Sequence, residues 1–236
     1  MRKQAIILIG PPGAGKGTQA ELLADKLGLY HFETSRILEQ KFKGADSLPP
    51  DSKERIVKVG NEEYDMSKEL EIWKTGRLCS PPFVVFLVKE KIKELFSQDK
   101  SLVFSGSPRT LFEGKELAPF LKDLYGPENV SVISINISPE ATIFRNSHRR
   151  ICELMRHSIL YSKETEKLSM CPLDGSKLVR REGLDDPETI KVRLKEYKER
   201  TLPLIEYLET ENLKMIKIKG EQSVSDVFKD ILKEIE

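Results

Sequence analysis

The sequence predicts an α/β fold, in which a five-stranded parallel sheet is flanked by helices and interrupted by two inserted mobile lobes. Three observations predict it. Short apolar runs alternate with longer helical patterns along the chain. The first apolar run, residues 4–9, is unbroken, as expected of a strand that is buried on both faces. Two long polar stretches lie between core elements and not at a terminus.

The core elements are expected to alternate in chain order. Strands are expected at residues 4–9, 30–33, 101–105, 130–137 and 214–219. Helices are expected at residues 16–27, 82–96, 112–124, 139–150, 187–209 and 223–236. This alternation favours a parallel sheet that is covered on both faces.

The two polar stretches predict the lobes. Residues 42–79 contain several glycines and prolines before a helical piece at 66–74, and residues 151–186 hold two cysteines. Loops of this length without secondary structure are uncommon in compact domains, which favours inserted lobes over two long surface loops. The predicted division is a core of residues 1–33, 80–150 and 187–236 with two inserted lobes, residues 34–79 and residues 151–186.

The composition is that of an ordinary globular protein. The 236 residues include 39 basic and 38 acidic ones, so no bulk attraction to nucleic acid or to a membrane is expected. No run approaches the roughly 20 apolar residues of a membrane span, and the N-terminal run is too short for a signal peptide. A cytoplasmic location is therefore expected. A monomer is also expected, because inserted lobes must swing freely and no exposed apolar stripe is evident.

Residues 10–18 carry the strongest chemical signal. They read GPPGAGKGT, close to the pattern G-x-x-x-x-G-K-[ST], directly after the first strand and at the start of a helix. Glycines let backbone N–H groups turn inward around an anion, and the helix N-terminus adds partial positive charge. A glycine-rich turn with an exposed lysine is the alternative, which the strand and helix context disfavours. The pattern predicts a P-loop for ATP phosphates, formed by Gly13, Ala14, Gly15, Lys16, Gly17 and Thr18.

In the common pattern a serine or threonine directly follows the lysine, whereas here Gly17 follows Lys16 and the hydroxyl residue is Thr18. This shifted form, GxPGxGKGT, resembles the P-loop of the adenylate kinase family of nucleoside monophosphate kinases. Further motifs follow in the order of that family and cover nearly the whole chain. They are His31-Phe-Glu-Thr34-Ser35, Gly76-Arg77-Leu78, Gly106-Ser107-Pro108-Arg109-Thr110, Arg145, Arg149-Arg150, Arg181, Asp185-Asp186, Arg193 and Gly220. The resemblance implies transfer of the γ-phosphoryl group of ATP, with Mg²⁺, to a nucleoside monophosphate, most simply AMP.

The resemblance also implies that the core is a P-loop domain, that residues 34–79 form a monophosphate-binding lobe and that residues 151–186 form a lid, and it implies the site residues. The catalytic set would be Lys16, Arg109, Arg149, Arg181 and Arg193. ATP would be bound by the P-loop residues with Arg145, Arg149 and Gly220. The monophosphate would be bound by Thr34, Ser35, Gly106, Arg109, Glu113, Arg181 and Arg193. A lysine and several arginines suit this chemistry, because phosphoryl transfer depends on positioning and neutralising anionic oxygens. Arg150 could equally be a solvated surface charge.

Three departures from the family pattern lie on the monophosphate side. Ser105 stands where an aspartate normally orders water around magnesium, so magnesium is held by ATP and water alone or another acid substitutes. Arg36 and Glu39 exchange the usual acid and base, and Arg36 could bind the phosphate or pair with Glu39. Glu113 replaces a glutamine that commonly reads adenine. The departures leave open an AMP kinase, a related kinase for another small acceptor, and a nucleotide-binding regulatory protein with weak or no transfer.

The lid carries part of a zinc motif. Many family members have a C-x-x-C…C-x-x-[CD] site, of which Cys152, Cys171 and Asp174 are present. Met155 occupies the second ligand position, and His157 could complete a tetrahedron. A knuckle held by packing and hydrogen bonds is favoured over a structural zinc, because a lost ligand removes most of the affinity. Cys79 is expected to pack beside the monophosphate site, and three cysteines form no disulfide framework.

Overall fold

The computed structural model describes residues 3–49, 52–156, 158–181 and 185–235. Its centre is a five-stranded parallel sheet in the order β10 (Lys214–Lys219), β6 (Val130–Asn136), β1 (Ala5–Ile9), β5 (Leu102–Phe104) and β2 (Tyr30–Phe32). In the centre of the sheet, Ala5 lies opposite Leu102 on one side and Val130 on the other. The predicted α/β fold with five parallel strands is confirmed, and every strand lies within its predicted range.

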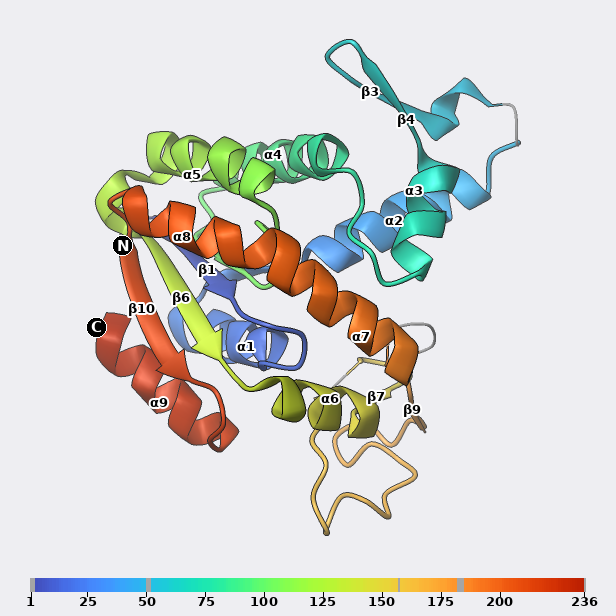
Figure 1. Ribbon diagram of the computed structural model, residues 1–236, viewed down its shortest axis with the longest axis vertical. Coiled ribbons are helices and arrows are strands. Elements are labelled where there is room, and N and C mark those ends of the chain that lie inside the picture. The colour runs from blue at the N-terminus through green and yellow to red at the C-terminus, as the bar shows by residue number, and fades with distance from the viewer. Residues whose placement is uncertain (1–2, 50–51, 157, 182–184, 236) are drawn as a thin grey trace.

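Helices cover both faces of this sheet (Figure 1). They are α1 (Lys16–Leu27), α4 (Pro81–Ser97), α5 (Leu111–Tyr125), α6 (Pro139–His148), α7 (Pro187–Glu196), α8 (Leu202–Thr210) and α9 (Val224–Ile235). Ile7 of β1 packs into a cluster with side chains of α4, α5 and α8, whereas its neighbour Ile6 packs with side chains of α1 and α9. Successive residues of a strand face opposite sides of its sheet, so β1 is buried on both faces, as its unbroken apolar run predicts.

The predicted lobe of residues 34–79 contains helices and a small sheet. It consists of α2 (Thr34–Asp46), η1 (Lys53–Arg55), the antiparallel strands β3 (Ile56–Val59) and β4 (Glu62–Asp65), and α3 (Met66–Lys74). The sequence analysis found α3 but missed α2 and the hairpin. The apolar spacing of Leu38, Phe42 and Ala45, all buried in the core, was a helical signal. Gly60, with a φ of 61°, begins the two-residue Gly-Asn turn that is typical of a hairpin.

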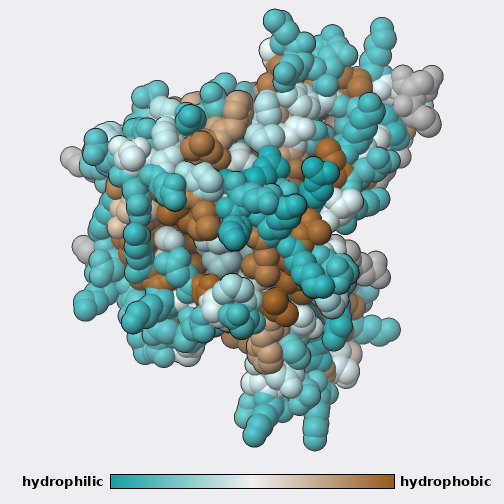
Figure 2. Space-filling model, in the orientation of Figure 1, coloured by the Kyte–Doolittle hydropathy of each residue, from teal (hydrophilic) through white to brown (hydrophobic). Residues whose placement is uncertain are grey.

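Another small sheet lies in the region predicted to be the lid. Its strands are β8 (Ser158–Ile159), β7 (Arg150–Cys152) and β9 (Leu178–Val179), in that order and antiparallel. The space-filling view shows this unit and the β3–β4 hairpin projecting at the two ends of the molecule (Figure 2). The boundaries of the core, the monophosphate-binding lobe and the lid remain a prediction.

Two helix predictions were wrong in extent. The helix predicted at 139–150 ends at His148, because Arg149 is extended and Arg150 pairs with Ile159 in the lid sheet. The helix predicted at 187–209 is interrupted by a π-helical turn, Tyr197–Thr201, before α8. Pro203 lies at the start of α8 and has no N–H to donate to the preceding turn, which accounts for the changed hydrogen-bond pattern.

No helix among the described residues combines the length and the apolar character needed to cross a bilayer.

The contact between α5 and α8 yields a first prediction. A Cβ at Gly114 would lie 2.2 Å from Leu204 Cδ1, and Leu204 is fully buried. Gly114→Ala should therefore lower the free energy of unfolding by about 1–3 kcal/mol, measured by urea denaturation, because a well-packed core cannot absorb the methyl group. The matched control is Gly44→Ala in α2, where no atom lies within 4 Å of the added Cβ.

The control should raise the free energy of unfolding by about 0.5–1 kcal/mol, since alanine is a better helix former than glycine. Equal effects of the two substitutions would contradict the close packing of α5 on α8.

Candidate functional site

A cavity of about 470 Å³ lies at the carboxyl edge of the sheet, where β1 and β5 end. It is lined by residues of the loop before α1, the start of α2, the segment after β5, α6, the lid and α7. Every residue that the sequence analysis assigned to the site lines this cavity. These are Gly13, Ala14, Gly15, Lys16, Gly17, Thr18, Thr34, Ser35, Gly106, Arg109, Glu113, Arg145, Arg149, Arg181, Arg193 and Gly220. Arg150 is bound elsewhere, to the carbonyls of Thr165 and Leu168.

The loop between β1 and α1 has the conformation of an anion cradle. Gly13 and Gly15 adopt φ angles of 82° and 92°, in the left-handed region that favours glycine. A Cβ at Gly13 would also lie 2.6 Å from Asn146 Nδ2, so close packing excludes a side chain there. The loop leads directly into α1, whose first N–H groups have no partner within the helix. Backbone N–H groups at a helix N-terminus bind phosphate well.

Lys16 reaches back over this loop. Its Nζ donates hydrogen bonds to the carbonyls of Gly10 at 2.6 Å and Pro11 at 2.9 Å. Burial and the positive charges of Arg109, Arg193 and Arg149 hold the pKa of Lys16 well below its usual value. An anionic ligand in the cavity would favour the charged form of Lys16 and relieve its repulsion by these arginines.

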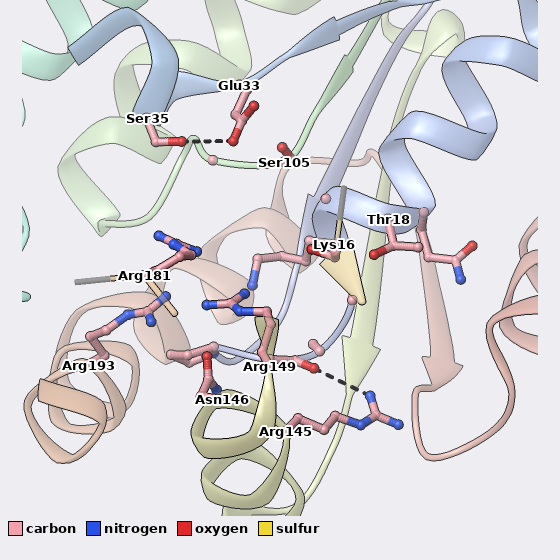
Figure 3. Close-up of a pocket in the computed structure, with 18 of the residues that line it drawn as sticks. Lys16, Thr18, Glu33, Ser35, Ser105, Arg145, Asn146, Arg149, Arg181 and Arg193 are labelled. Atoms are coloured by element: carbon pink, nitrogen blue, oxygen red, sulfur yellow. Dashed lines mark hydrogen bonds between the residues drawn. The ribbon is translucent and has the colours of Figure 1, made fainter. Parts of the chain in front are cut away.

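A buried aspartate holds two of the arginines. Asp185 accepts hydrogen bonds from Arg149 Nη2 at 2.5 Å and Arg149 Nε at 3.2 Å, and it lies 3.6 Å from Arg193 Nη1. Only 1% of the Asp185 side chain is exposed. Burial and neighbouring arginines lower the pKa of Arg193 to about 9 and that of Arg181 to about 10. Both remain charged at neutral pH, and Figure 3 shows Lys16, Arg149, Arg181 and Arg193 with their nitrogen atoms turned toward one space.

Arg109 is positioned through its backbone. Its N–H donates to Glu113 Oε2 at 2.9 Å, and its carbonyl accepts from Thr201 Oγ1 at 2.7 Å. Thr201 lies in the π-helical turn before α8, so this turn contacts the site directly. Burial lowers the pKa of the Arg109 guanidinium, partly countered by Glu113 and Glu33.

Glu113 caps a helix. Thr110 is the N-cap residue of α5, where its Oγ1 accepts from the Glu113 N–H at 3.2 Å and donates to Glu113 Oε1 at 3.1 Å. Glu113 Oε2 accepts from Arg109, so both carboxylate oxygens have partners in the protein. The sequence analysis considered Glu113 only in relation to the base of the acceptor. The T-x-x-E spacing of a capping box was the signal for its second role.

The other departures from the family pattern also have partners. Ser105 Oγ lies 2.7 Å from His31 Nε2. Arg36 forms an ion pair with Glu33 at 2.6 Å, and Glu39 forms one with Arg156 of the lid at 2.7 Å. The sequence left two alternatives for Arg36, which were to bind the phosphate or to pair with Glu39. Among the described residues, the structure shows no ion pair between Arg36 and Glu39. Glu33, which also accepts a hydrogen bond from Ser35 Oγ at 3.0 Å, lines the cavity beside Ser105 (Figure 3).

The side of the cavity near β6 and β10 brings Arg145 and Gly220 into contact. Arg145 Nη2 donates to the Gly220 carbonyl at 2.8 Å, and Arg145 Nη1 donates to the Gly13 carbonyl at 3.4 Å. Phe144 and Tyr161 line the cavity beside them with ring centroids 5.6 Å apart. The sequence analysis missed these two rings, because an exposed aromatic residue on a helix or in a loop carries no distinctive spacing.

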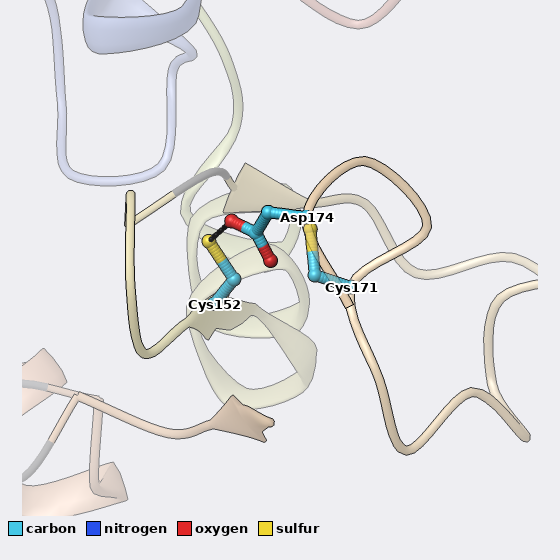
Figure 4. Close-up of side chains that lie close together, drawn as sticks. All are labelled: Cys152, Cys171 and Asp174. Atoms are coloured by element: carbon cyan, nitrogen blue, oxygen red, sulfur yellow. Dashed lines mark hydrogen bonds between the residues drawn. The ribbon is translucent and has the colours of Figure 1, made fainter. Parts of the chain in front are cut away.

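The lid brings the predicted cysteine group together. Cys152 Sγ, Cys171 Sγ and a carboxylate oxygen of Asp174 lie within 4.8 Å of one another (Figure 4). Cys152 Sγ donates to Asp174 Oδ2 at 3.1 Å, and hydrogen bonds from Ser176 and Cys152 lower the pKa of Asp174. The Met155 side chain is 59% exposed, and His157 lies outside the described residues. The predicted packing of Cys79 is seen in its burial beside the cavity.

The comparisons with known proteins agree on one family. The sequence profile described as "Adenylate kinase" matches residues 8–213. An adenylate kinase of Petrotoga mobilis is 35% identical over 230 residues, which cover 96% of this chain and 94% of the relative. An adenylate kinase of Caldicellulosiruptor saccharolyticus is 32% identical over 97% of both chains. One of Methanosarcina barkeri is 30% identical over 96% of this chain and 95% of the relative.

The capping role of Glu113 predicts a pH-dependent stability difference. Burial raises the pKa of Glu113 above its ordinary value of 4.5, although Arg109 and Thr110 act against the rise. The folded protein therefore holds this proton more tightly than the unfolded chain does, and its stability falls as the pH rises above 4.5 toward the raised pKa. Glu113→Gln removes the ionisation, so its free energy of unfolding relative to the wild type should increase between pH 4.5 and pH 7.

Urea denaturation at several pH values measures this difference. Glu116→Gln is the matched control, because Glu116 lies on the same helix with 45% of its side chain exposed. A difference between Glu113→Gln and the wild type that stays constant across the pH range would contradict the raised pKa.

Proposed function

The chain belongs to the adenylate kinase family, and we propose that it transfers the γ-phosphoryl group of ATP to AMP, giving two molecules of ADP. One observation carries the proposal: Lys16, Arg109, Arg149, Arg181 and Arg193 line one cavity beside a glycine-rich loop, although they come from distant parts of the chain. Such a group of cations suits a reaction whose main demand is the stabilisation of charge on phosphate oxygens.

The donor ATP is placed on the β6 and β10 side of the cavity. The backbone N–H groups of residues 13–18 and the Lys16 Nζ would bind its phosphates, with Lys16 leaving the carbonyls of Gly10 and Pro11 to do so. The Arg145 guanidinium, fixed by the carbonyls of Gly13 and Gly220, would lie over the adenine ring. Arg149 would reach the outer phosphates of ATP.

The acceptor is placed on the β5 and β2 side. Arg109 would bind the phosphate of the monophosphate, and its backbone contacts with Glu113 and Thr201 keep it in place. The start of α2 at Thr34 and Ser35 would form the wall of this pocket. Gly106 allows the close approach, since a Cβ there would lie 2.9 Å from Thr34 Oγ1. Glu113 would shape this pocket by holding Arg109, because its own oxygens already have protein partners.

The transferred group would pass between these two sides. Arg181, Arg193 and Arg149 would neutralise the charge that spreads over its equatorial oxygens. Asp185 holds two of these arginines in advance, so little reorganisation is needed when the substrates bind. No general base is required, because the acceptor phosphate is already ionised at neutral pH. The lid, which supplies Arg181, would also keep water from accepting the phosphoryl group.

Magnesium would enter with ATP. The oxygen donors that line the cavity, the Thr18 hydroxyl and the Glu33 carboxylate, are of the kind that Mg²⁺ binds directly or through water. Bound Mg²⁺ would add positive charge to the ATP phosphates. We propose that Glu33 is the acid that substitutes for the family's aspartate at Ser105.

A structural zinc in the lid is a lesser part of the proposal. Two thiols and a carboxylate within 4.8 Å are a donor set that zinc accepts, but structural zinc sites normally have four protein ligands. We therefore propose that the hydrogen-bonded group of Cys152, Cys171 and Asp174 stabilises the lid without requiring the metal. Elemental analysis of the purified protein tests this; one equivalent of bound zinc would contradict it.

We also propose that the three predicted units act as a core, a monophosphate-binding lobe and a mobile lid, in a cytoplasmic monomer. The separate small sheets of residues 56–65 and 150–179 support this division. A related acceptor in place of AMP, and a regulatory protein with weak or no transfer, are the alternatives that the acceptor side leaves to experiment.

The proposal predicts the outcome of an acceptor panel. With MgATP and each nucleoside monophosphate in turn, ADP should form with AMP and much more slowly with the others. Turnover confined to another monophosphate would select the related kinase. ATP binding without transfer to any acceptor would select the regulatory protein.

The charge mechanism predicts the effect of removing Lys16. Lys16→Ala should lower kcat at least about 100-fold, because preorganised charge is the main catalytic contribution. The matched control is Lys115→Ala, since Lys115 is exposed on α5 and should retain wild-type turnover. A Lys16→Ala variant that folds and keeps near-wild-type turnover would refute the mechanism.

A further inference from the structure

An ion pair joins the lid to the monophosphate-binding lobe. Glu39 lies on α2, and Arg156 lies in the turn that follows β7 of the lid. Arg156 Nη1 donates to Glu39 Oε2 at 2.7 Å, although the two residues are 117 positions apart. The Glu39 side chain is 19% exposed and that of Arg156 is 42% exposed. This contact can form only when the two lobes approach each other, because each partner belongs to a different lobe.

The backbone of Arg156 is unusual. Among the described residues, only Asp99, Arg156 and Asn212 have a positive φ without being glycine. Aspartate and asparagine tolerate the left-handed region comparatively well, whereas arginine does not. Arg156, with a φ of 61°, closes a turn by donating its N–H to the Cys152 carbonyl at 3.0 Å. Glycine would fit this turn better, so the turn alone gives no reason for an arginine.

The surroundings of the pair are strongly positive. Arg156 lines the cavity, and its charge is one of those that lower the pKa of Arg181. Arg156 and Arg181 both belong to the lid, so without a nearby carboxylate the positive charge of Arg156 would only add to the repulsion within it. Glu39 supplies that carboxylate, while the neighbouring Arg36 is paired with Glu33 at 2.6 Å.

We propose that Arg156 and Glu39 form a clasp, an ion pair that fixes the lid against α2 and so positions Arg181 over the acceptor phosphate. The effect of the clasp on the KM for AMP rests on the proposed function. Its effect on the distance between the two lobes does not. Arg156 is a positioning residue in this scheme, because it acts through the arrangement of the lobes. The pair is partly exposed, so its strength should fall as salt concentration rises.

The test compares four variants of the full chain: Glu39→Gln, Arg156→Gln, the double variant, and Arg156→Gly. The inter-lobe distance is measured between spin labels on Lys53→Cys and Lys167→Cys, which replace exposed residues in the two lobes. The three native cysteines are buried, which favours labelling at the introduced positions. The Michaelis constant for AMP, kcat and the thermal unfolding midpoint are measured on the same variants without labels.

Each single variant should shift the distances toward longer values and raise the KM for AMP about two- to five-fold, the scale of a partly exposed ion pair. The kcat should change less than the KM, because saturating substrates draw the lid closed and bring Arg181 into place even without the ion pair. The double variant should behave like either single variant, since both lose the same contact. Raising the salt concentration should diminish the difference from the wild type.

Arg156→Gly separates the clasp from a purely structural role. Glycine suits the left-handed turn, so the unfolding midpoint should equal or exceed that of the wild type while the distances lengthen and the KM rises. Glu116→Gln is the control. It removes the ion pair between Lys89 and Glu116, whose atoms are 2.6 Å apart and which does not line the cavity, so it should change neither the inter-lobe distance nor the KM.

Wild-type distances and KM in Arg156→Gly would overturn the clasp, as would fully additive effects of the two Gln substitutions. If the wild type transfers phosphoryl to no monophosphate, the proposed function fails. The distance measurements still decide whether the clasp exists in that case, so the two failures can be told apart.

Discussion

The structure depends on keeping several positive side chains close together in a partly buried cavity. Burial, together with the repulsion among these charges, lowers the pKa values of Lys16, Arg181 and Arg193. The fold resists this repulsion with short-range contacts: loop carbonyls hold Lys16, and Asp185 holds Arg149 and Arg193. Entry of a polyphosphate would neutralise these positive charges, and the arginines that Asp185 already holds would need little rearrangement.

Much of this fold was predictable from sequence, because its strands are continuous apolar runs and its P-loop has a fixed spacing. The predicted site residues all lie around one cavity, since family motifs place them at strand ends and helix starts. Contacts between distant segments were not predictable. The hydrogen bond from Thr201 to the Arg109 carbonyl spans 92 positions and depends on a π-helical turn that no local pattern announced. Helix α2 was missed because most of its residues are polar. Its buried residues Leu38, Phe42 and Ala45 follow one another at intervals of four and three positions, which is a helical spacing.

The acceptor side shows how exchanged residues are accommodated. Each departure from the family pattern has acquired a partner within the protein: Ser105 with His31, Arg36 with Glu33, and Glu39 with Arg156. Glu113 is absorbed into the cap of α5. A buried or half-buried charge without a partner would be costly, so these pairings explain how the substitutions coexist with an ordered cavity.

The order of the strands has a consequence for how such a protein can change over time. With β1 in the middle (Figure 1), the groups that we propose for the donor follow β6 and β10 on one flank, and those proposed for the acceptor follow β5 and β2 on the other. The two halves of the site share the central loop and the arginines between them, and most other residues of each half belong to one flank, so mutation can remodel one flank while the other is retained. The altered positions around the acceptor pocket, Ser105, Arg36, Glu39 and Glu113, follow β5 and β2. Selectivity for the second nucleotide can thus drift in a lineage while the capacity to use ATP is inherited intact.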